Sequence, residues 1–437
     1  MSHRAFPAEL SDAALFSATE RYGDLGVHAI VDVRRRFSRD EIEHAVQGAI
    51  AAFPVLGRRY EPGAWRDRWR VVEGPVGDAI HVGDAAADLE DATAAWARRP
   101  IDVTRERPIR VTSLTRPGGS RLILSLSHIA ADGGGMAAVG NVLGARLYGV
   151  PTIAPVERRR SVSAALAGLG WRHLPVLARD ALGTLGMPLR LLRAGKRDRP
   201  FSTGRGEASW RHLRIRSADL EQIKARCRPA GASVNDALIA ALARVATTRS
   251  SSGPVVVMYT MDLRRYAGAP RLTAANTSTI LVAIVPRESV GDLATTAGAV
   301  AAITAKQRRG LVGPASILVP LSMAVGAPHA WVRQMTHWLE PVLVDLPLRR
   351  GLMVTNIGRL DDGLATFGED IESVRVIGPS VRGVDVPTVV AFGFRGELHL
   401  QLFAAPGLAP AALEELESGL RRALELDEPH DPDECHA

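Results

Sequence analysis

One histidine and one aspartate, four positions apart, are the side chains in this sequence best suited to chemistry. His128 ends the segment RLILSLSH, and Asp132 precedes the glycines Gly133, Gly134 and Gly135. An imidazole can take a proton from a hydroxyl or an amine near neutral pH. Glycines carry no side-chain bulk, so their backbone N–H groups can approach a ligand. The pattern predicts an acid–base site in which His128 removes a proton.

The flanking residues indicate the elements that position this pair. Leucines alternate with other residues before His128, which is typical of a strand: Leu122, Leu124 and Leu126. Apolar residues recur at helical spacing after the glycines: Met136, Val139, Leu143 and Leu147. Gly149 then stands where a helix would end. We therefore expect His128 at the carboxyl end of a strand, on its leucine face, and Asp132 in a glycine-rich connection to the helix.

The phrase His-x-x-x-Asp-Gly, at His128, Asp132 and Gly133, resembles the active-site motif of the CoA-dependent acyltransferase superfamily. This superfamily includes chloramphenicol acetyltransferase, the plant BAHD transferases, polyketide-associated acyltransferases, wax ester synthase/diacylglycerol acyltransferases and the condensation domains of peptide synthetases. The resemblance implies an α/β (α+β) fold of two chloramphenicol-acetyltransferase-like lobes, each a mixed sheet flanked by helices. It also implies that Asp132 shapes the loop through an ion pair. Many members have two adjacent histidines, whereas Ser127 holds the first position here.

Three further phrases resemble segments of the same superfamily. Asp262-Leu263-Arg264 matches a D-x-R phrase whose arginine pairs with the motif aspartate, so Arg264 is the expected partner of Asp132. Asn276 falls where relatives often have Gly-Asn before a strand, which makes it a possible substrate or oxyanion residue, and its alternative role is a turn amide. The segment LMVTNIGR resembles a strand end that faces the site. Its Thr355 or Asn356 side chain, or the backbone N–H of Gly133, could stabilise an oxyanion.

Composition excludes several classes of protein. The chain has 437 residues, a net charge of +7 and 46% hydrophobic residues, which is typical of a globular protein. Only three of the 54 basic residues are lysines, so the basic charge indicates biased codon usage and we expect no nucleic-acid partner. Two cysteines, Cys227 and Cys435, imply no disulfide framework. Neither a signal peptide nor an apolar run of about 18 residues is present, so a cytoplasmic location is expected.

The sequence predicts four parts: an N-terminal lobe at 1–195, a crossover linker at 196–208, a C-terminal lobe at 209–427 and a tail at 428–437. Two apolar regions leave alternatives open. Region 161–193 is apolar and basic, and helices packed over the core with arginines outward are favoured over a membrane-surface segment. Region 314–349 either lines an acyl channel or forms plain core.

Two other motifs in the sequence compete with this interpretation. Gly133, Gly135 and Ala138 meet the G-x-G-x-x-A spacing of a dinucleotide-binding turn, but the segment 151–155 is not a credible second strand. Near the carboxyl end, His430 and Cys435 with the neighbouring His436 could ligate a metal, but a polar, proline-containing tail is more often disordered. No metal site is therefore expected.

These observations predict a cytoplasmic acyltransferase of secondary metabolism that transfers groups other than aminoacyl groups. It would move an acyl group from a thioester to a hydroxyl or amine of a small-molecule acceptor, with His128 as general base. Acyl-CoA or a phosphopantetheinyl carrier protein would be the co-substrate, with no tightly bound cofactor. Two alternatives remain open: a free-standing condensation-type enzyme acting on carrier-protein-bound intermediates, and a non-catalytic binding protein with the same fold.

Overall fold

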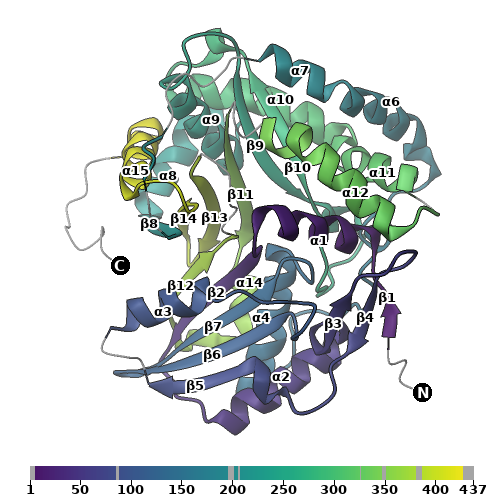
Figure 1. Cartoon of the computed structure of the whole chain (residues 1–437). Helices are drawn as coiled ribbons and strands as arrows, with labels where there is room; N and C mark the ends of the chain where they lie inside the picture. Colours follow the sequence, from purple (N-terminus) through teal and green to yellow (C-terminus); the bar gives the residue numbers. More distant parts are fainter. Residues whose placement is uncertain are drawn as a thin grey trace.

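Two large mixed β-sheets, one in each lobe, organise the molecule (Figure 1). The computed structural model describes residues 5–84, 88–194, 201–204, 207–324, 326–346, 351–379 and 386–426. The first sheet has the order β12 (Ile371–Ile377), β2 (Gly26–Val33), β7 (Gly119–Ser127), β6 (Ile109–Arg116) and β5 (Ile80–Asp84). Only its β5–β6 pair is parallel. The fold class expected from the sequence is confirmed.

The second sheet has the order β10 (Ser278–Val285), β9 (Val255–Asp262), β11 (Gly351–Arg359), β13 (Thr388–Phe394), β14 (Glu397–Ala404) and β8 (Ser209–Ile215). β11 runs parallel to both of its neighbours, and the other pairs are antiparallel. A small third sheet joins β1 (Ala5–Pro7), β4 (Arg68–Val71) and β3 (Arg58–Glu61). Each large sheet contributes to a hydrophobic core of its own.

Helices flank the sheets. Those before β8 are α1 (Leu10–Tyr22), α2 (Arg39–Ala52), α3 (Leu89–Arg98), α4 (Gly133–Tyr148), α5 (Val162–Ala165), α6 (Leu174–Leu185) and α7 (Met187–Arg193). Those after β8 are α8 (Ser217–Cys227), α9 (Val234–Thr247), α10 (Leu293–Arg309), α11 (Val312–Ala324), α12 (His329–Glu340), α14 (Asp361–Leu364) and α15 (Pro410–Leu424). Short 3-10 turns include η5 (Leu263–Tyr266) and η8 (Ala365–Asp370), and η7 (Pro341–Asp345) is a π-helix.

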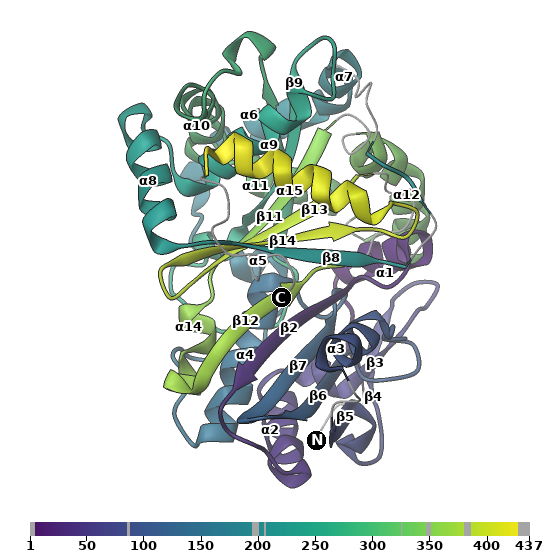
Figure 2. The same ribbon diagram turned by 90° about the vertical axis from the view of Figure 1, so that its left-hand side faces the viewer.

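The lobes exchange elements. β12 follows β11 in the chain, yet it pairs with β2 at the edge of the first sheet, as Figure 2 shows. In return, α1 packs against α12, where the Ser17 hydroxyl donates to the carbonyl of Arg333 at 3.0 Å. The division into an N-terminal lobe, a linker and a C-terminal lobe stays a prediction. Residues 371–377 were assigned to the C-terminal lobe, but they form the edge strand of the first sheet. The tail 428–437 and parts of the linker lie outside the described residues.

Capping residues fix several helix ends. Ser38 and Glu41 form a reciprocal capping box at the start of α2, and Ser233 and Asp236 form one at the start of α9. Gly149 ends α4 in the left-handed conformation with φ of 66°, as glycine readily does. One expectation was wrong: Gly133 to Gly135 are the first turn of α4 rather than a connection, because Asp132 is the N-cap.

The two apolar regions differ from the favoured expectation. In 161–193 the helices do pack on the second lobe, but five of their leucines face outward together with the arginines. In 314–349, Trp331 and Trp338 are exposed rather than core residues. Apolar periodicity identifies one face of a helix but not what that face meets. Within the described residues, no helix combines the length and the apolar character needed to cross a membrane.

Candidate active site

The imidazole of His128 is held by one side-chain amide. His128 lies in the turn after β7, half-buried, with its backbone N–H bonded to the carbonyl of Leu25 at 3.2 Å. Its Nδ1 lies 2.9 Å from Oδ1 of Asn276, a buried residue of the loop before β10. The site therefore forms where the end of a first-lobe strand meets a second-lobe loop.

The hydrogen bonds of Asn276 determine the tautomer of His128. The Asn276 Nδ2 group donates to the carbonyl of Ile129 at 3.1 Å, which assigns the amide oxygen to the side that faces the imidazole. An oxygen acceptor requires the neutral ring to carry its proton on Nδ1. Nε2 then presents a lone pair, and no described residue hydrogen-bonds to it. This is the form needed by a general base, and it gives Asn276 a positioning role that neither sequence-based alternative included.

Asp132 anchors the loop between the strand and α4. Its Oδ1 accepts from the Gly135 N–H at 2.9 Å, and its Oδ2 accepts from the Thr277 N–H and the Ser278 hydroxyl, each at 2.9 Å. Arg264 adds two hydrogen bonds to the same carboxylate, at 2.8 and 3.2 Å. The structure thus brings together Asp132 and the arginine that the D-x-R phrase indicated, and the carboxylate points into this network.

Electrostatics favours the ionised form of Asp132. Burial alone would raise the pKa of this carboxyl, because the side chain is almost fully enclosed. The charge of Arg264 and the hydrogen bonds from Arg264, Gly135 and Thr277 outweigh burial and hold the pKa below its usual range. Asp132 is therefore a structural anion and not a proton carrier at neutral pH.

The glycines after Asp132 make room for protein groups. A Cβ on Gly134 would lie 2.7 Å from Nη1 of Arg264, and one on Gly135 would lie 3.3 Å from the backbone nitrogen of Ala275. Close packing against the ion pair therefore accounts for Gly134, and close packing against the loop that contains Ala275 accounts for Gly135. The N–H groups of Gly133 and Gly134 have no described hydrogen-bond partner and lie at the positive end of the α4 dipole.

A buried arginine that the sequence analysis missed supports the same loops. Arg160 donates through Nη2 to the carbonyls of Ile129 and Ala130, both at 3.1 Å, and through Nε to the carbonyl of Ala274 at 3.1 Å. Asp12 compensates its charge through bonds of 2.7 and 3.0 Å. Arg160 thus ties the turn after His128 to the loop that carries Asn276. It stands in the run Glu-Arg-Arg-Arg-Ser, which offers no signal that distinguishes it from Arg158 and Arg159.

Within the described residues, the predicted oxyanion residues on β11, Thr355 and Asn356, form no hydrogen bond to His128, Asn276 or Asp132. The Asn356 Nδ2 group lies 3.3 Å from Oδ1 of Asn235, and its own Oδ1 accepts from Gly358 N–H at 2.8 Å. The end of β11 does reach the start of α4, because a Cβ on Gly133 would lie 3.1 Å from Ile357.

A pocket of about 450 Å³ lies between the lobes, beside β2, which pairs with the strand β7 that leads to His128. Its walls include Asp24 and His28 from the first lobe and Trp210 and Phe403 from the second. Asp24 Oδ2 and His28 Nε2 both lie within about 3.1 Å of where a Gly26 Cβ would be, so the two groups converge there. Burial raises the pKa of Asp24 to about 6 and lowers the pKa of His28 to about 4. The pocket has the size of a small-molecule site and offers a carboxyl and a neutral imidazole.

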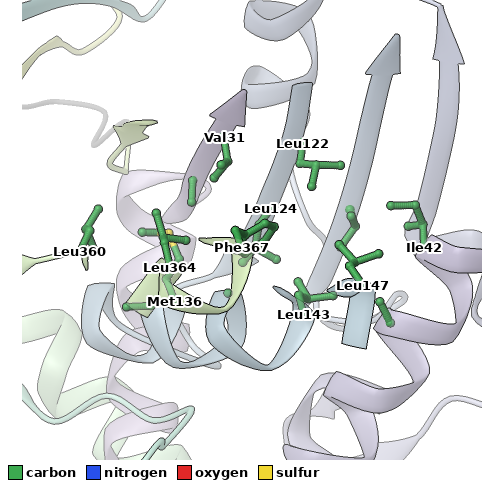
Figure 3. A pocket seen from close by; sticks show the side chains of 15 residues that line it. Val31, Ile42, Leu122, Leu124, Met136, Leu143, Leu147, Leu360, Leu364 and Phe367 are labelled. Carbon is green, nitrogen blue, oxygen red and sulfur yellow. The ribbon is translucent and has the colours of Figure 1, made fainter. Parts of the chain in front are cut away.

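A second cavity, of about 30 Å³, lies inside the first lobe under α4. Figure 3 shows side chains of α4, including Met136 and Leu143, facing Leu124 of β7 and Phe367 of η8. Its lining is apolar, and its volume is too small for an organic substrate. This cavity is therefore a packing defect of the core and not a binding site.

The described residues give no indication of a metal site or of a dinucleotide-binding site. No cluster of three or more metal-ligating side chains occurs among them, and His430, Cys435 and His436 lie outside them. The segment after α4 does not return to the first sheet as a parallel strand, since the next described strand is β8 of the second sheet. The glycines at the start of α4 therefore do not belong to a dinucleotide-binding βαβ unit.

Comparison with known proteins gives matches in structure alone. No protein-family model and no curated protein sequence matches the chain. Polyketide synthase associated protein 5 from Mycobacterium tuberculosis is 17% identical with a TM-score of 0.63, over 96% of this chain and 96% of that one. The first condensation domain of the CDA synthetase is 17% identical with a TM-score of 0.68, over 97% and 96% of the two chains. The trichothecene 15-O-acetyltransferase from Fusarium sporotrichioides is 11% identical with a TM-score of 0.68, over 96% and 95%. The expected resemblance to this superfamily is confirmed at the level of the fold.

Proposed function

We propose that this chain, which has the fold of condensation domains and of related acyltransferases, transfers an acyl group from a thioester to a hydroxyl or amine. The observation that carries the proposal is the state of His128. Oδ1 of Asn276 accepts a hydrogen bond from the Nδ1–H group of the His128 ring, and no described residue hydrogen-bonds to Nε2. A histidine prepared in this way acts as a general base on a bound acceptor.

The proposed reaction requires one proton carrier. His128 Nε2 takes the proton of the acceptor O–H or N–H while that oxygen or nitrogen bonds to the thioester carbonyl carbon. The carbonyl oxygen becomes negatively charged, and the N–H groups of Gly133 and Gly134 at the start of α4 are the candidate donors to it. Breakage of the C–S bond then releases a thiolate, which receives the proton from Nε2. Asp132, Arg264 and Arg160 hold the loops and take no part in proton transfer.

The substrate classes follow from the surroundings of the site. The pocket that contains Asp24 and His28 has room for part of a small acceptor, and a hydroxyl or amine of the acceptor other than the reacting one would donate to the Asp24 carboxylate. The net charge of +7 suits an acidic donor, either the phosphates of acyl-CoA or an acylated carrier protein. No tightly bound cofactor is part of the proposal, and a cytoplasmic role in secondary metabolism remains its expected setting.

Thiol release tests the proposal. The protein is incubated with a panel of acyl-CoAs and mixed alcohol and amine acceptors, and free thiol is measured against His128→Ala. His44→Ala, an exposed histidine on α2, is the matched control. We expect acceptor-dependent release that falls by at least about 10²-fold in His128→Ala and stays unchanged in His44→Ala. Release that survives in a folded His128→Ala protein would contradict the assignment of the base.

A second candidate is a condensation-type reaction on carrier-bound intermediates, which the similarity to a condensation domain favours. It uses the same base but requires a carrier protein. Activity with acylated carrier proteins and none with acyl-CoA would select this candidate. Inactivity with both donors would favour a non-catalytic binding protein of the same fold.

A further inference from the structure

An exposed leucine stripe runs along α6 and α7. The leucines Leu174, Leu182, Leu185, Leu189 and Leu192 are 60%, 73%, 62%, 53% and 58% exposed, and Trp171 before α6 is 77% exposed. Isolated exposed apolar residues are common, but a contiguous row of large ones marks an interaction surface. No other described helix exposes as many leucines.

The spacing places these side chains on one face. Leu174, Ala178, Leu182, Leu185, Leu189 and Leu192 are separated by four, four, three, four and three positions, which is the repeat of a single helical face. Gly186, which joins the two helices, has helical dihedral angles. The stripe therefore continues from α6 into α7 over about 30 Å.

The opposite face of the two helices is attached to the second lobe. Asp180 of α6 is buried and accepts from the backbone N–H of Leu311 at 2.6 Å. Leu191 of α7 is buried beside Val256 of β9. Figure 1 shows α6 and α7 end to end along the outer edge of the upper lobe. The leucines are thus outward because the other face is already packed.

The charges beside the stripe have one sign. Arg172, Arg190 and Arg193 are exposed and form no ion pair with a described residue. The only acid between residues 171 and 193 is Asp180, which is buried and paired with Arg179 at 2.8 Å. Contact between two copies of this face would bring arginines together with no acid to pair them. Anionic headgroups would compensate them, and the leucines and Trp171 would enter the acyl boundary.

We propose that α6 and α7 form a membrane-binding face that lies in the interface of an anionic lipid bilayer. The leucines and Trp171 insert between lipids, and the flanking arginines contact phosphate groups. This binding needs neither the thioester nor the acceptor, so it stands or falls independently of the proposed transfer reaction.

Co-sedimentation of the full chain with lipid vesicles tests the proposal. Vesicles of phosphatidylcholine with about 30% phosphatidylglycerol are compared with pure phosphatidylcholine. The first variant is Leu182→Glu/Leu189→Glu, and the matched control, Trp65→Glu/Ile153→Glu, adds the same charge at two exposed apolar residues elsewhere. Because all four positions are exposed, these variants should keep the native far-UV circular dichroism.

We expect the native chain and the control to bind the anionic vesicles, and the leucine variant to lose at least about tenfold in partition coefficient. The variant Arg190→Gln/Arg193→Gln should lose about tenfold on anionic vesicles only. Trp171 emission, taken as the difference from Trp171→Phe, should shift to shorter wavelength on binding. Absence of binding by the native chain, or equal binding by the leucine variant, overturns the proposal. A dimer of the native chain that Leu182→Glu/Leu189→Glu dissociates overturns it in favour of a contact between copies.

Discussion

Removal of either partner of the Asp132–Arg264 ion pair should destabilise the protein, and by different amounts. Asp132→Ala leaves the enclosed Arg264 guanidinium with Asp262, at 3.2 Å, as its remaining counter-charge, and it removes the N-cap of α4. Together these losses cost about 4 kcal/mol. Arg264→Met costs about 3 kcal/mol, because Asp132 keeps three donors: Gly135 N–H, Thr277 N–H and the Ser278 hydroxyl.

The double variant tests whether the two losses share one cause. If the pair interacts as described, Asp132→Ala/Arg264→Met should cost about 4 kcal/mol rather than about 7, a coupling of about 3 kcal/mol. Urea unfolding at pH 7.5, followed by circular dichroism and tryptophan fluorescence, measures each variant. Arg265→Met is the control, because Arg265 is exposed and bonds to no carboxylate among the described residues, and it should change stability by less than about 0.5 kcal/mol.

Acid titration gives an independent check of the same pair. The folded pKa of Asp132 lies below its usual range, so the pair contributes its stability above about pH 4 and loses it as pH falls through the folded pKa. The stability difference between the native chain and Asp132→Ala should therefore shrink below pH 4. Additive single costs, or a difference that does not change with acid, would refute the role given to this pair.

Three further predictions concern the core, the interlobe pocket and the base. Gly140→Ala should stabilise the protein by about 0.4–1 kcal/mol in thermal unfolding, because the new Cβ would enter the cavity under α4 at 3.5 Å from Leu364. Gly144→Ala should instead destabilise it by about 1–3 kcal/mol, because the new Cβ would clash with Phe367 at 2.6 Å. The folded pKa of Asp24, about 6, exceeds the unfolded value of about 3.9, so ionisation of Asp24 costs stability as pH rises through 6. In urea unfolding, the free energy of unfolding of Asp24→Asn minus that of the native chain should therefore rise by about 1–2 kcal/mol between pH 5 and pH 7.5. Asn276→Leu should lower acceptor-dependent thiol release on the order of 10²-fold, and it should cause no further loss when it is added to His128→Ala. Additive losses would show that Asn276 acts elsewhere.

The sequence predicted local elements better than their partners. Apolar spacing and a terminal glycine such as Gly149 are encoded locally, so helix α4 and strand β7 were predicted. The alternation in β12 indicates a strand but contains no information about which sheet it joins. The helices of 161–193 were expected to pack over the core with only their arginines outward, and the exposed leucines were missed because periodicity defines a face and not its environment.

The candidate site was predicted only as far as motif residues extend. Asp132 and Arg264 were paired because a known phrase connects them across a long stretch of sequence. Arg160 was missed because three neighbouring arginines look alike until packing encloses one of them. The hydrogen bond between His128 Nδ1 and Asn276 Oδ1 forms because two loops far apart in the sequence meet. A local sequence pattern cannot predict such a contact.

The exchange of β12 has a consequence for how the protein is made. While the ribosome synthesises the chain, β2 and β7 emerge early, but β12 emerges about 250 residues after β7, roughly 12 to 50 seconds later at ordinary rates. Throughout that interval the outer edge of β2 has unpaired backbone groups, and such an edge can pair with another nascent chain. Release of a truncated product that lacks residues 371–377 should therefore yield aggregates rather than an isolated first lobe.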